Sequence, residues 1–308
     1  MLTLEEMGTL TGQTAKSAAG EIGLSSLSRS AGGRLCIPRE AVRELLASRG
    51  CEYLPQTVAF VSLKGGVGKT TAAVTTAVRA AQYGFNTCLL DLDPQASATL
   101  TFDQVPDSEA PLFCDLWSNP GEFVEPALVP IEPGLCLIPS ALENALLDTA
   151  LADPRVQVNA VQGVVDTLCN LGLDLVVIDC PPSLGTATVS AVCAANTVVI
   201  PLACDPYSQH AVALTLQEIE AIRHNFGLAL PRQQLLVSRF DRRERIAREI
   251  FESLANDYPE ILVGNPIPVS TEFNKALAER QTIFAHNRGS LAKREYDRFV
   301  RALLGLQV

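Results

Sequence analysis

A glycine-rich stretch early in the chain has the residue types that hold a phosphate chain. In "FVSLKGGVGKTT", Gly65, Gly66 and Gly68 allow successive backbone N–H groups to turn toward phosphate oxygens with no side chain in the way. Lys69 supplies a positive charge for the β- and γ-phosphates, and the hydroxyl of Thr70 is a suitable ligand for Mg²⁺. The stretch therefore predicts a site for a nucleoside triphosphate and Mg²⁺.

This loop departs from the usual G-x-x-x-x-G-K-[ST] pattern in two ways. Leu63 occupies the position of the first glycine, and Lys64 adds a second lysine. The flanking sequences still fit, because an apolar β-branched run precedes the loop and an alanine-rich helix, ending at Gly84, follows it with its N-terminus toward the anion. The residues predicted to contact the nucleotide are Lys64, Gly65, Gly66, Val67, Gly68, Lys69, Thr70 and Thr71.

Three aspartates stand at the ends of two further apolar runs. Asp91 and Asp93 follow "NTCLL", and Asp179 closes "LDLVVI". Ligands of α/β sheets lie beyond the carboxyl ends of the strands, so these acids are expected near the loop. An aspartate that ends a buried strand is costly unless it serves a cation, which indicates Asp179 as an outer-shell acid for Mg²⁺. Capping of a following helix is the alternative for each aspartate.

The elements that must position these residues alternate along the chain. Short apolar runs separated by helical stretches predict an α/β fold with a doubly wound, mostly parallel sheet. The expected strands cover residues 58–63, 87–92, 135–138, 173–178, 197–202, 235–238 and 261–263. An acidic, proline-rich segment at 103–133 is interpreted as mixed loop and helix over the active face.

We expect two domains, a small one at residues 1–55 and a P-loop ATPase domain at residues 56–308. The first part predicts a small helical domain with helices at 4–12, 13–23 and 38–50 and a Ser/Gly-rich turn or wing at 25–37. This order is typical of a winged helix-turn-helix domain that binds DNA. Lys16 is the one obvious residue in its second helix for contacts with phosphates or bases. A helical docking module is the alternative.

Composition limits the classes of function. The 308 residues are 47% hydrophobic and carry a net charge of −10, and no apolar run is long enough to span a membrane. The acidic N-terminus does not resemble a secretory signal, so we expect a cytoplasmic protein. Nine cysteines in mostly apolar surroundings indicate buried thiols in a reducing compartment, and three scattered histidines make a zinc site improbable.

Taken together, the motifs resemble a known family. "KGGVGKTT", "DLDPQ", "VVIDCPPSLG" and "IPLACDPYS" occur in the order and spacing of the ParA/Soj branch of the deviant Walker A ATPases, which is related to MinD. The resemblance runs from about Thr57 to Phe299. It implies ATP and Mg²⁺ as cofactors, and two subunits that face each other across two sandwiched ATP molecules.

The resemblance also implies roles for individual residues. Lys64 corresponds to the lysine that reaches the phosphates bound by the partner subunit, Lys69 and Thr70 hold phosphate and metal, Asp93 orients the attacking water, and Asp179 supports the metal. The implied catalytic residues are Lys64, Lys69 and Asp93, with Asp91 a weaker candidate. Charge placed on the transferred phosphoryl group accelerates the reaction, and a residue supplied in trans makes hydrolysis depend on assembly.

The function implied is a dimerising ATPase switch that partitions or positions DNA or another large cargo. Its ATP hydrolysis is weak alone and stimulated by a ParB-like or other adaptor, and the protein is expected to be cytoplasmic and nucleoid-associated. Two alternatives remain: a MinD-like regulator on a membrane surface, and an iron-sulfur electron-transfer ATPase, for which Cys180 would be one of several required thiolates. We predict that the last helix packs into the core, and a membrane-binding tail like that of MinD is the alternative.

Non-specific DNA binding is predicted for one helix near the C-terminus. Residues 239–301 contain twelve basic and ten acidic residues, so the rest of the chain carries −12. Asp241 and Glu244 have capping-box spacing, which predicts a helix start there. Residues 246, 247, 250, 251 and 254 then form the buried face. The predicted DNA contacts on the exposed face are Arg242, Arg243, Arg245 and Arg248.

A solvated face paired with glutamates is the alternative for this helix. The family's DNA binding cannot simply be transferred, because Val269 and Glu272 replace two arginines that are common in Soj-like proteins.

Overall fold

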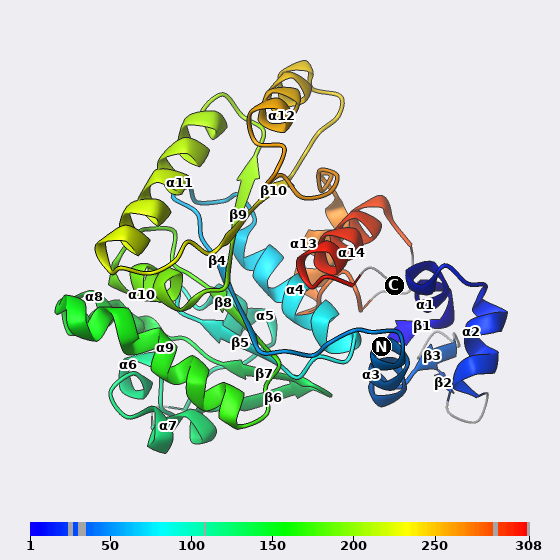
Figure 1. The fold of residues 1–308 in the computed structure, drawn as a ribbon, viewed down its shortest axis with the longest axis horizontal. Coiled ribbons are helices and arrows are strands. Elements are labelled where there is room, and N and C mark those ends of the chain that lie inside the picture. The colour runs from blue at the N-terminus through cyan, green and yellow to red at the C-terminus, as the bar shows by residue number, and fades with distance from the viewer. Residues whose placement is uncertain (24–26, 30–34, 108, 286–288, 307–308) are drawn as a thin grey trace.

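A seven-stranded sheet forms the centre of the molecule in the computed structural model (Figure 1). The structure describes residues 1–23, 27–29, 35–107, 109–285 and 289–306. The strand order is β10-β9-β4-β8-β5-β7-β6, with every pair parallel except the antiparallel pair β6–β7. This confirms the predicted α/β class with a mostly parallel, doubly wound sheet.

The helices and strands of the main body follow one another in the expected alternation. The strands are β4 (Gln56–Phe60), β5 (Thr87–Asp91), β6 (Val129–Glu132), β7 (Leu135–Ile138), β8 (Leu175–Asp179), β9 (Thr197–Ala203) and β10 (Arg232–Ser238). The longer helices are α4 (Lys69–Gln82), α9 (Pro154–Asn170), α10 (Thr186–Ala194), α11 (Ser208–Asn225), α12 (Arg245–Asp257) and α14 (Leu291–Leu303). The shorter ones are α5 (Ser97–Thr101), α6 (Phe113–Leu116), α7 (Pro120–Ala127), the 3₁₀ helix η2 (Leu142–Leu146), α8 (Leu147–Ala150) and α13 (Thr271–Ala278).

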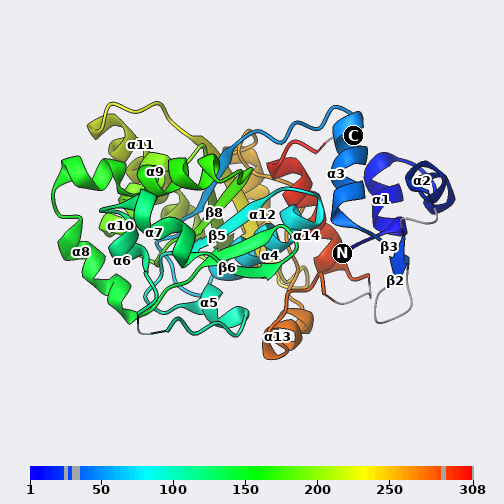
Figure 2. The ribbon, with the colours of Figure 1, turned by 90° about the horizontal axis from the view of Figure 1, so that it is seen from below.

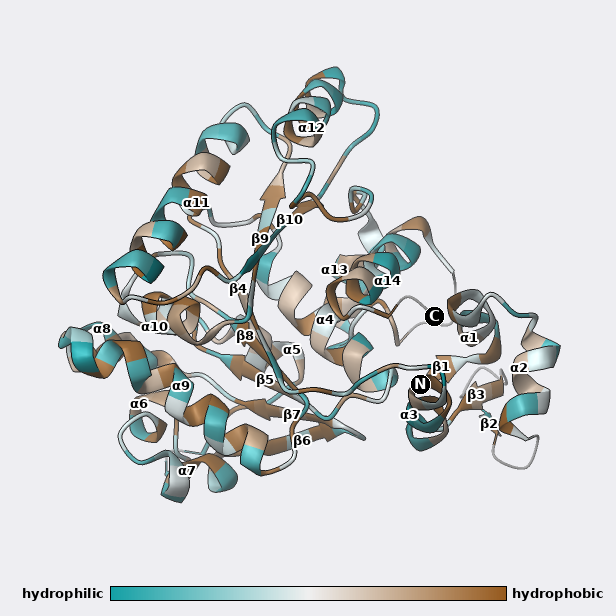
Figure 3. Cartoon of the chain, viewed as in Figure 1, coloured by the Kyte–Doolittle hydropathy of each residue, from teal (hydrophilic) through white to brown (hydrophobic). Residues whose placement is uncertain are grey.

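Alternate residues of each strand enter two hydrophobic cores, one on each face of the sheet. Val58 and Phe60 of β4 pack on the face covered by α4 and α14, whereas Ala59 packs on the face covered by α9, α10 and α11. Both faces are buried, so the central strands are almost continuously hydrophobic (Figure 3).

Several predicted boundaries were wrong. β4 ends at Phe60 rather than at residue 63, because the following residues already form the loop. Residues 261–263 make only a bridge between Leu262 and Leu235. The segment 103–133 contributes β6 to the sheet edge and α7 to the packing around α9. None of its described residues lines the cavity of about 560 Å³ beside the glycine-rich loop, so the predicted position over the active face was wrong.

The N-terminal residues fold into helices and a small sheet at one end of the molecule (Figure 2). The elements are β1 (Leu2–Thr3), α1 (Leu4–Thr11), α2 (Ala15–Ile22), β2 (Ser28–Arg29), β3 (Leu35–Ile37) and α3 (Arg39–Ser48). The sheet order is β1-β3-β2, antiparallel throughout. Residues 24–26 and 30–34, where part of the wing was predicted, lie outside the described residues. The three helices were predicted correctly; β1 was not predicted.

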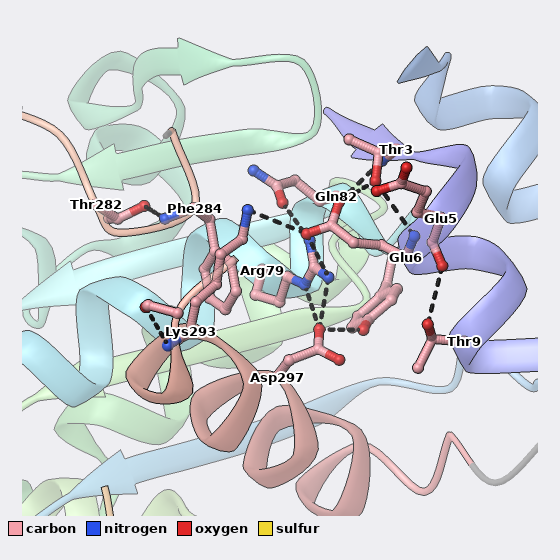
Figure 4. A network of polar contacts seen from close by, with 12 residues as sticks. Thr3, Glu5, Glu6, Thr9, Arg79, Gln82, Thr282, Phe284, Lys293 and Asp297 are labelled. Atoms are coloured by element: carbon pink, nitrogen blue, oxygen red, sulfur yellow. Dashed lines mark hydrogen bonds and ion pairs between the residues drawn. The ribbon is translucent and has the colours of Figure 1, made fainter. Parts of the chain in front are cut away.

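A buried ionic network joins this N-terminal unit to the far end of α4 (Figure 4). Glu6 caps α1 through Oε2, which accepts from the backbone N–H of Thr3 at 2.9 Å, while Oε1 lies 3.4 Å from Arg79 and 3.1 Å from Lys293. The guanidinium of Arg79 is only 1% exposed and also pairs with Asp297 of α14. Burial alone would raise the pKa of Glu6, but Arg79 and Lys293 lower it from 4.5 to about 2.

A second contact fixes α3 against the turn after α4. The carbonyl of Gly84 accepts hydrogen bonds from Arg39 at 2.9 Å and from Arg43 at 2.6 Å, and Arg43 also pairs with Asp174. Gly84 has φ 94°, and a Cβ atom there would lie 2.7 Å from Cβ of Arg43. Only glycine fits this position, so the N-terminal unit is packed closely against the sheet.

Candidate active site

The glycine-rich loop lies between β4 and α4, at the carboxyl end of the sheet. Gly66 has φ 76° and Gly68 has φ 86°, a left-handed conformation that side chains disfavour. Gly68 is the residue before the first turn of α4, so Lys69 and Thr70 open the helix as the sequence predicted. The free N–H groups of this helix end face the same region as the loop.

The end of β10, which is separated from β4 by β9 in the sheet, holds the loop in this shape. Ser238, the last residue of β10, donates a hydrogen bond to the carbonyl of Val67, and Arg239 donates one to the carbonyl of Gly66 at 2.9 Å. A Cβ atom on Gly68 would lie 3.4 Å from Oγ of Ser238. The side chain of Val67 is buried and does not line the cavity beside this loop. Any contact of Val67 with the nucleotide would therefore be made by its backbone.

Lys69 and Asp179 form a buried ion pair at the base of the loop. Nζ of Lys69 lies 2.8 Å from Oδ1 of Asp179, and the two side chains are 7% and 0% exposed. Burial alone would lower the pKa of Lys69, but the charge of Asp179 and the hydrogen bond to it raise the pKa above its usual value. Lys69 is therefore cationic where phosphate oxygens are expected.

The residues around Asp179 fit a hydrated Mg²⁺ ion. Oδ2 of Asp179 is buried and has no hydrogen-bond partner among the described residues, although a buried carboxylate oxygen normally has one. Thr70 lines the adjacent cavity, whereas Asp179 lies behind the cavity wall. This arrangement suits direct coordination by the Thr70 hydroxyl and contact through water by Asp179.

Asp93 and Asp91 have different surroundings although they are two residues apart. Asp93 lines the cavity, and its Oδ1 accepts from the backbone N–H of Gln95 at 3.0 Å, which leaves Oδ2 for another donor. Asp91 is fully buried and accepts hydrogen bonds from Asp93 N–H and from both the N–H and hydroxyl of Thr99. Burial and the charge of Asp179 raise the pKa of Asp91 to about 7. Asp91 thus orients the turn that carries Asp93.

A cavity of about 560 Å³ extends from the loop toward α13 and α14, a volume suitable for a nucleotide. Gly65, Gly66, Thr70 and Asp93 line one end of it. The other end is lined by residues that the sequence did not predict to form part of the site: Ile267, Pro268, Val269, Phe273, Leu277, Ile283 and Tyr296. The second group is mainly apolar and offers a surface for a flat base.

Lys64 lies at the rim of the same cavity and points to a different partner from Lys69. Its side chain is 40% exposed, and Nζ forms an ion pair with Asp205 in the loop between β9 and α11. The structure thus brings Lys64, Lys69, Thr70 and Asp93 to one cavity. It assigns the two lysines to separate acids.

The predicted DNA-binding arginines follow the carboxyl end of β10, before and within α12. Arg242, Arg243, Arg245 and Arg248 are exposed, as predicted. The predicted helix start was wrong: α12 begins at Arg245, because the carboxylate of Asp241 accepts from the N–H and guanidinium of Arg243 instead of capping a helix.

Two of these four arginines, Arg243 and Arg245, form ion pairs with acidic side chains. Arg245 pairs with Glu249 at 2.7 Å, which supports the solvated-face alternative for this residue. Ile246, which was predicted to be buried, is 47% exposed.

Three features bear on the alternative functions. The last helix α14 is amphipathic, and its apolar residues Tyr296, Phe299, Val300 and Leu303 are buried, which confirms the predicted core packing. None of the helices described is both long and apolar enough to cross a membrane. Cys180 is fully buried behind Asp179, and burial raises the pKa of its thiol to about 12.

Comparisons with known proteins agree with this geometry. A family model described as an AAA domain matches residues 55–232. The chromosome-partitioning ATPase Soj of Thermus thermophilus is 30% identical over 252 residues, covering 80% of this chain and 94% of that protein. The cell division protein PomZ of Myxococcus xanthus is 26% identical over 245 residues, covering 80% and 76%.

Solved structures show the same fold. A complex of Cyanothece McdA with ATP superimposes with a TM-score of 0.73 at 20% identity, covering 82% of this chain and 96% of that one. Cobyrinic acid a,c-diamide synthase from Mycobacterium smegmatis, solved with ADP and magnesium, gives a TM-score of 0.67 at 26% identity, covering 82% and 94%.

Proposed function

Since this chain belongs to the ParA/Soj family of P-loop ATPases, we propose that it is a Mg·ATP-dependent dimerising switch that segregates or positions DNA or another large intracellular cargo. One observation carries the proposal: Lys64, Lys69 and Asp93 line a single nucleotide-sized cavity, yet Lys64 stands at its open rim. A rim lysine is placed to serve a site other than its own.

Phosphoryl transfer by these residues depends on position and charge. The N–H groups of the loop and the ammonium of Lys69 bind the phosphates, and Thr70 with Asp179 would hold Mg²⁺, which neutralises the charge that develops on the phosphates. Oδ2 of Asp93 accepts a hydrogen bond from the attacking water and orients it, since Oδ1 is already bonded to Gln95. Hydrolysis yields ADP and phosphate.

Lys64 completes the site of a second subunit in this proposal. Its exposed ammonium reaches the phosphates bound by the partner, so the protein hydrolyses ATP weakly alone and faster when a ParB-like or other adaptor stabilises the productive dimer. Assembly and hydrolysis are then coupled through one charge.

DNA is the proposed surface on which the switch acts. The four exposed arginines at the start of α12 supply phosphate contacts without sequence preference, and a dimer would present two such groups. The names of the relatives, chromosome-partitioning ATPase and cell division protein, support partition or positioning. We place the protein in the cytoplasm, associated with the nucleoid.

The N-terminal unit is proposed to be a winged helix-turn-helix domain. The turn between α1 and α2 passes through Gly12 at φ 66°, and Lys16 and Ser17 are exposed at the start of α2. A three-stranded antiparallel sheet joins β1, which precedes these helices, to β2 and β3, which follow them, and such a small sheet is typical of winged domains. A protein-docking role is distinguished by testing whether residues 1–55 are required for binding to a specific operator sequence.

The two other classes of function are less compatible with the site. A membrane-surface regulator would require an exposed amphipathic end, but the apolar face of α14 is used inside the core. An iron-sulfur ATPase would require accessible thiolates, but Cys180 is buried with a raised pKa.

Sedimentation velocity with and without ATP tests the proposal. Wild type should be monomeric with ADP and dimeric with ATP and Mg²⁺, and Asp93→Ala should accumulate the dimer because hydrolysis is slowed. Lys64→Ala should bind ATP but lose stimulated hydrolysis. A protein that remains monomeric with ATP while hydrolysing it at full rate would rule out the shared site.

A further inference from the structure

The ion pair between Lys64 and Asp205 joins the glycine-rich loop to a loop 141 residues later in the chain. Nζ of Lys64 contacts Oδ2 of Asp205, and the two side chains are 40% and 32% exposed. Both residues therefore lie at the surface, where a second subunit could reach them.

The carboxylate of Asp205 is held in place by its own turn. Its other oxygen, Oδ1, accepts from the backbone N–H of Tyr207 at 3.0 Å, and its N–H donates to Oγ of Ser208 at 3.2 Å. Ser208 is the first residue of α11 and is 2% exposed. Asp205 is thus a fixed acceptor, and its Oδ2 atom is directed to Lys64.

The backbone of Lys64 is fixed in the same way. Its N–H donates to Oγ of Ser62 at 3.2 Å, and the same hydroxyl donates to the carbonyl of Lys64 at 3.0 Å. Only the side chain of Lys64 is free to change partner. The carboxylate of Asp205 holds this ammonium on its own subunit and competes for it with the phosphates of another subunit.

We propose that Asp205 is a positioning residue that holds Lys64 within its own subunit, and that ATP-dependent dimerisation must break this ion pair before Lys64 can act in trans. The inference rests on the proposed function, because it gives the trans lysine a resting position. Burial would raise the pKa of Asp205, but the hydrogen bonds from Lys64 and Tyr207 lower it, so the carboxylate is charged at neutral pH.

In this proposal the ion pair weakens ATP-dependent dimerisation, because it must be broken when the dimer forms. A partly exposed pair is weak, so its loss should strengthen ATP-dependent dimerisation by roughly two- to fivefold and raise basal hydrolysis by a similar factor. Asp205→Asn is the appropriate variant, because the amide oxygen can still accept from Tyr207 while the negative charge is removed.

The first measurement needs no dimer. Acylation of lysine amines by a water-soluble ester, followed by mass spectrometry, reports how accessible and nucleophilic Nζ of Lys64 is. Asp205→Asn should increase labelling of Lys64 relative to wild type. Asp241→Asn is the matched control, since Asp241 also accepts from a backbone N–H two residues later and pairs with a side chain, Arg243.

The second measurement is a double-mutant cycle in the Asp93→Ala background, with ATP, Mg²⁺ and no DNA. Asp205→Asn should lower the dimer dissociation constant two- to fivefold, and should have no effect once Lys64→Ala is also present. A purely structural role for Asp205 would affect both backgrounds equally.

The outcomes separate the two ideas. Unchanged labelling of Lys64 in Asp205→Asn, or an effect on dimerisation that persists without Lys64, would overturn the inference while leaving the proposed function intact. Failure of the Asp93→Ala protein to dimerise with ATP would overturn the proposed function, and with it the role of Asp205 in assembly.

Discussion

Nζ of Lys69 lies 2.8 Å from Oδ1 of Asp179, and both side chains are buried beneath the glycine-rich loop. Each charge compensates for the desolvation of the other, so the pair stabilises the folded chain only while both members are present. Lys69 also faces the cavity where phosphates are proposed to bind. Its effects on folding and on binding must therefore be separated experimentally.

Lys69→Met is expected to lose ATP binding by at least 100-fold, because a charged hydrogen-bond donor to phosphate is removed. It should also lower the free energy of unfolding by about 3 kcal/mol, since Asp179 is left buried without its cation. The double variant Lys69→Met/Asp179→Asn should regain most of the stability but none of the binding. Thermal unfolding and titration with a fluorescent ATP analogue measure the two effects. Recovery of binding in the double variant would contradict the assignment.

Asp93→Ala should bind ATP with unchanged affinity and hydrolyse it about 100-fold more slowly. The reason is that Asp93 lines the cavity through a carboxylate with one oxygen free, while the phosphate contacts come from other residues. Single-turnover hydrolysis and equilibrium binding distinguish the two steps. Asp153→Ala is the control, because Asp153 is an exposed aspartate at the start of α9. An Asp93→Ala protein with a wild-type single-turnover rate would exclude the water-orienting role.

The sequence was sufficient to predict the loop and the acids at the strand ends, because these residues act close to where they stand in the chain. Gly66, Gly68 and Lys69 are parts of one turn, and Asp179 ends a strand hydrogen-bonded to the strand before that turn. Ser238 could have been found by the same rule, since it ends an apolar strand at the same sheet edge.

Other parts of the site depend on contacts that no local pattern encodes. The ion pair of Lys64 with Asp205 and the bond from Arg239 to Gly66 join loops more than 140 residues apart. The apolar end of the cavity comes from α13, from the segments before and after it, and from Tyr296 of α14. Arg79 lies in an alanine-rich helix that predicts no buried charge, and its burial follows only from the packing of α1 and α14.

Glu6 predicts a stability contribution with a defined pH range. Its pKa is lowered from 4.5 to about 2 in the folded protein, so the stabilisation is fully present above pH 4.5 and decreases as the pH falls toward 2. Glu6→Gln should lower the free energy of unfolding by about 1–3 kcal/mol at pH 7, because Arg79 loses one of its acids. The difference from wild type should shrink between pH 4.5 and 3 in thermal unfolding scans. Glu5→Gln is the control, because Glu5 is the exposed residue next to Glu6. A difference in stability between Glu6→Gln and wild type that does not change with pH would contradict the ionic contribution.

The exposed arginines around the start of α12 predict DNA binding that is insensitive to sequence and steeply dependent on salt. Replacing Arg242, Arg245 and Arg248 by glutamate should abolish ATP-dependent binding to duplex DNA and spare ATP hydrolysis measured without DNA, since none of these three arginines lines the nucleotide cavity. For wild type, the logarithm of the binding constant should fall with the logarithm of the salt concentration, by about 0.9 per phosphate neutralised. The control is a second triple variant in which glutamate replaces three exposed arginines on other elements, Arg155, Arg232 and Arg298. It has the same change in net charge and should lose far less affinity for DNA. If both triple variants lose affinity equally, net charge and not this surface determines binding. If neither does, the arginines form a solvated face, and the DNA contact lies in the N-terminal unit or among Lys275, Arg280, Lys293 and Arg294.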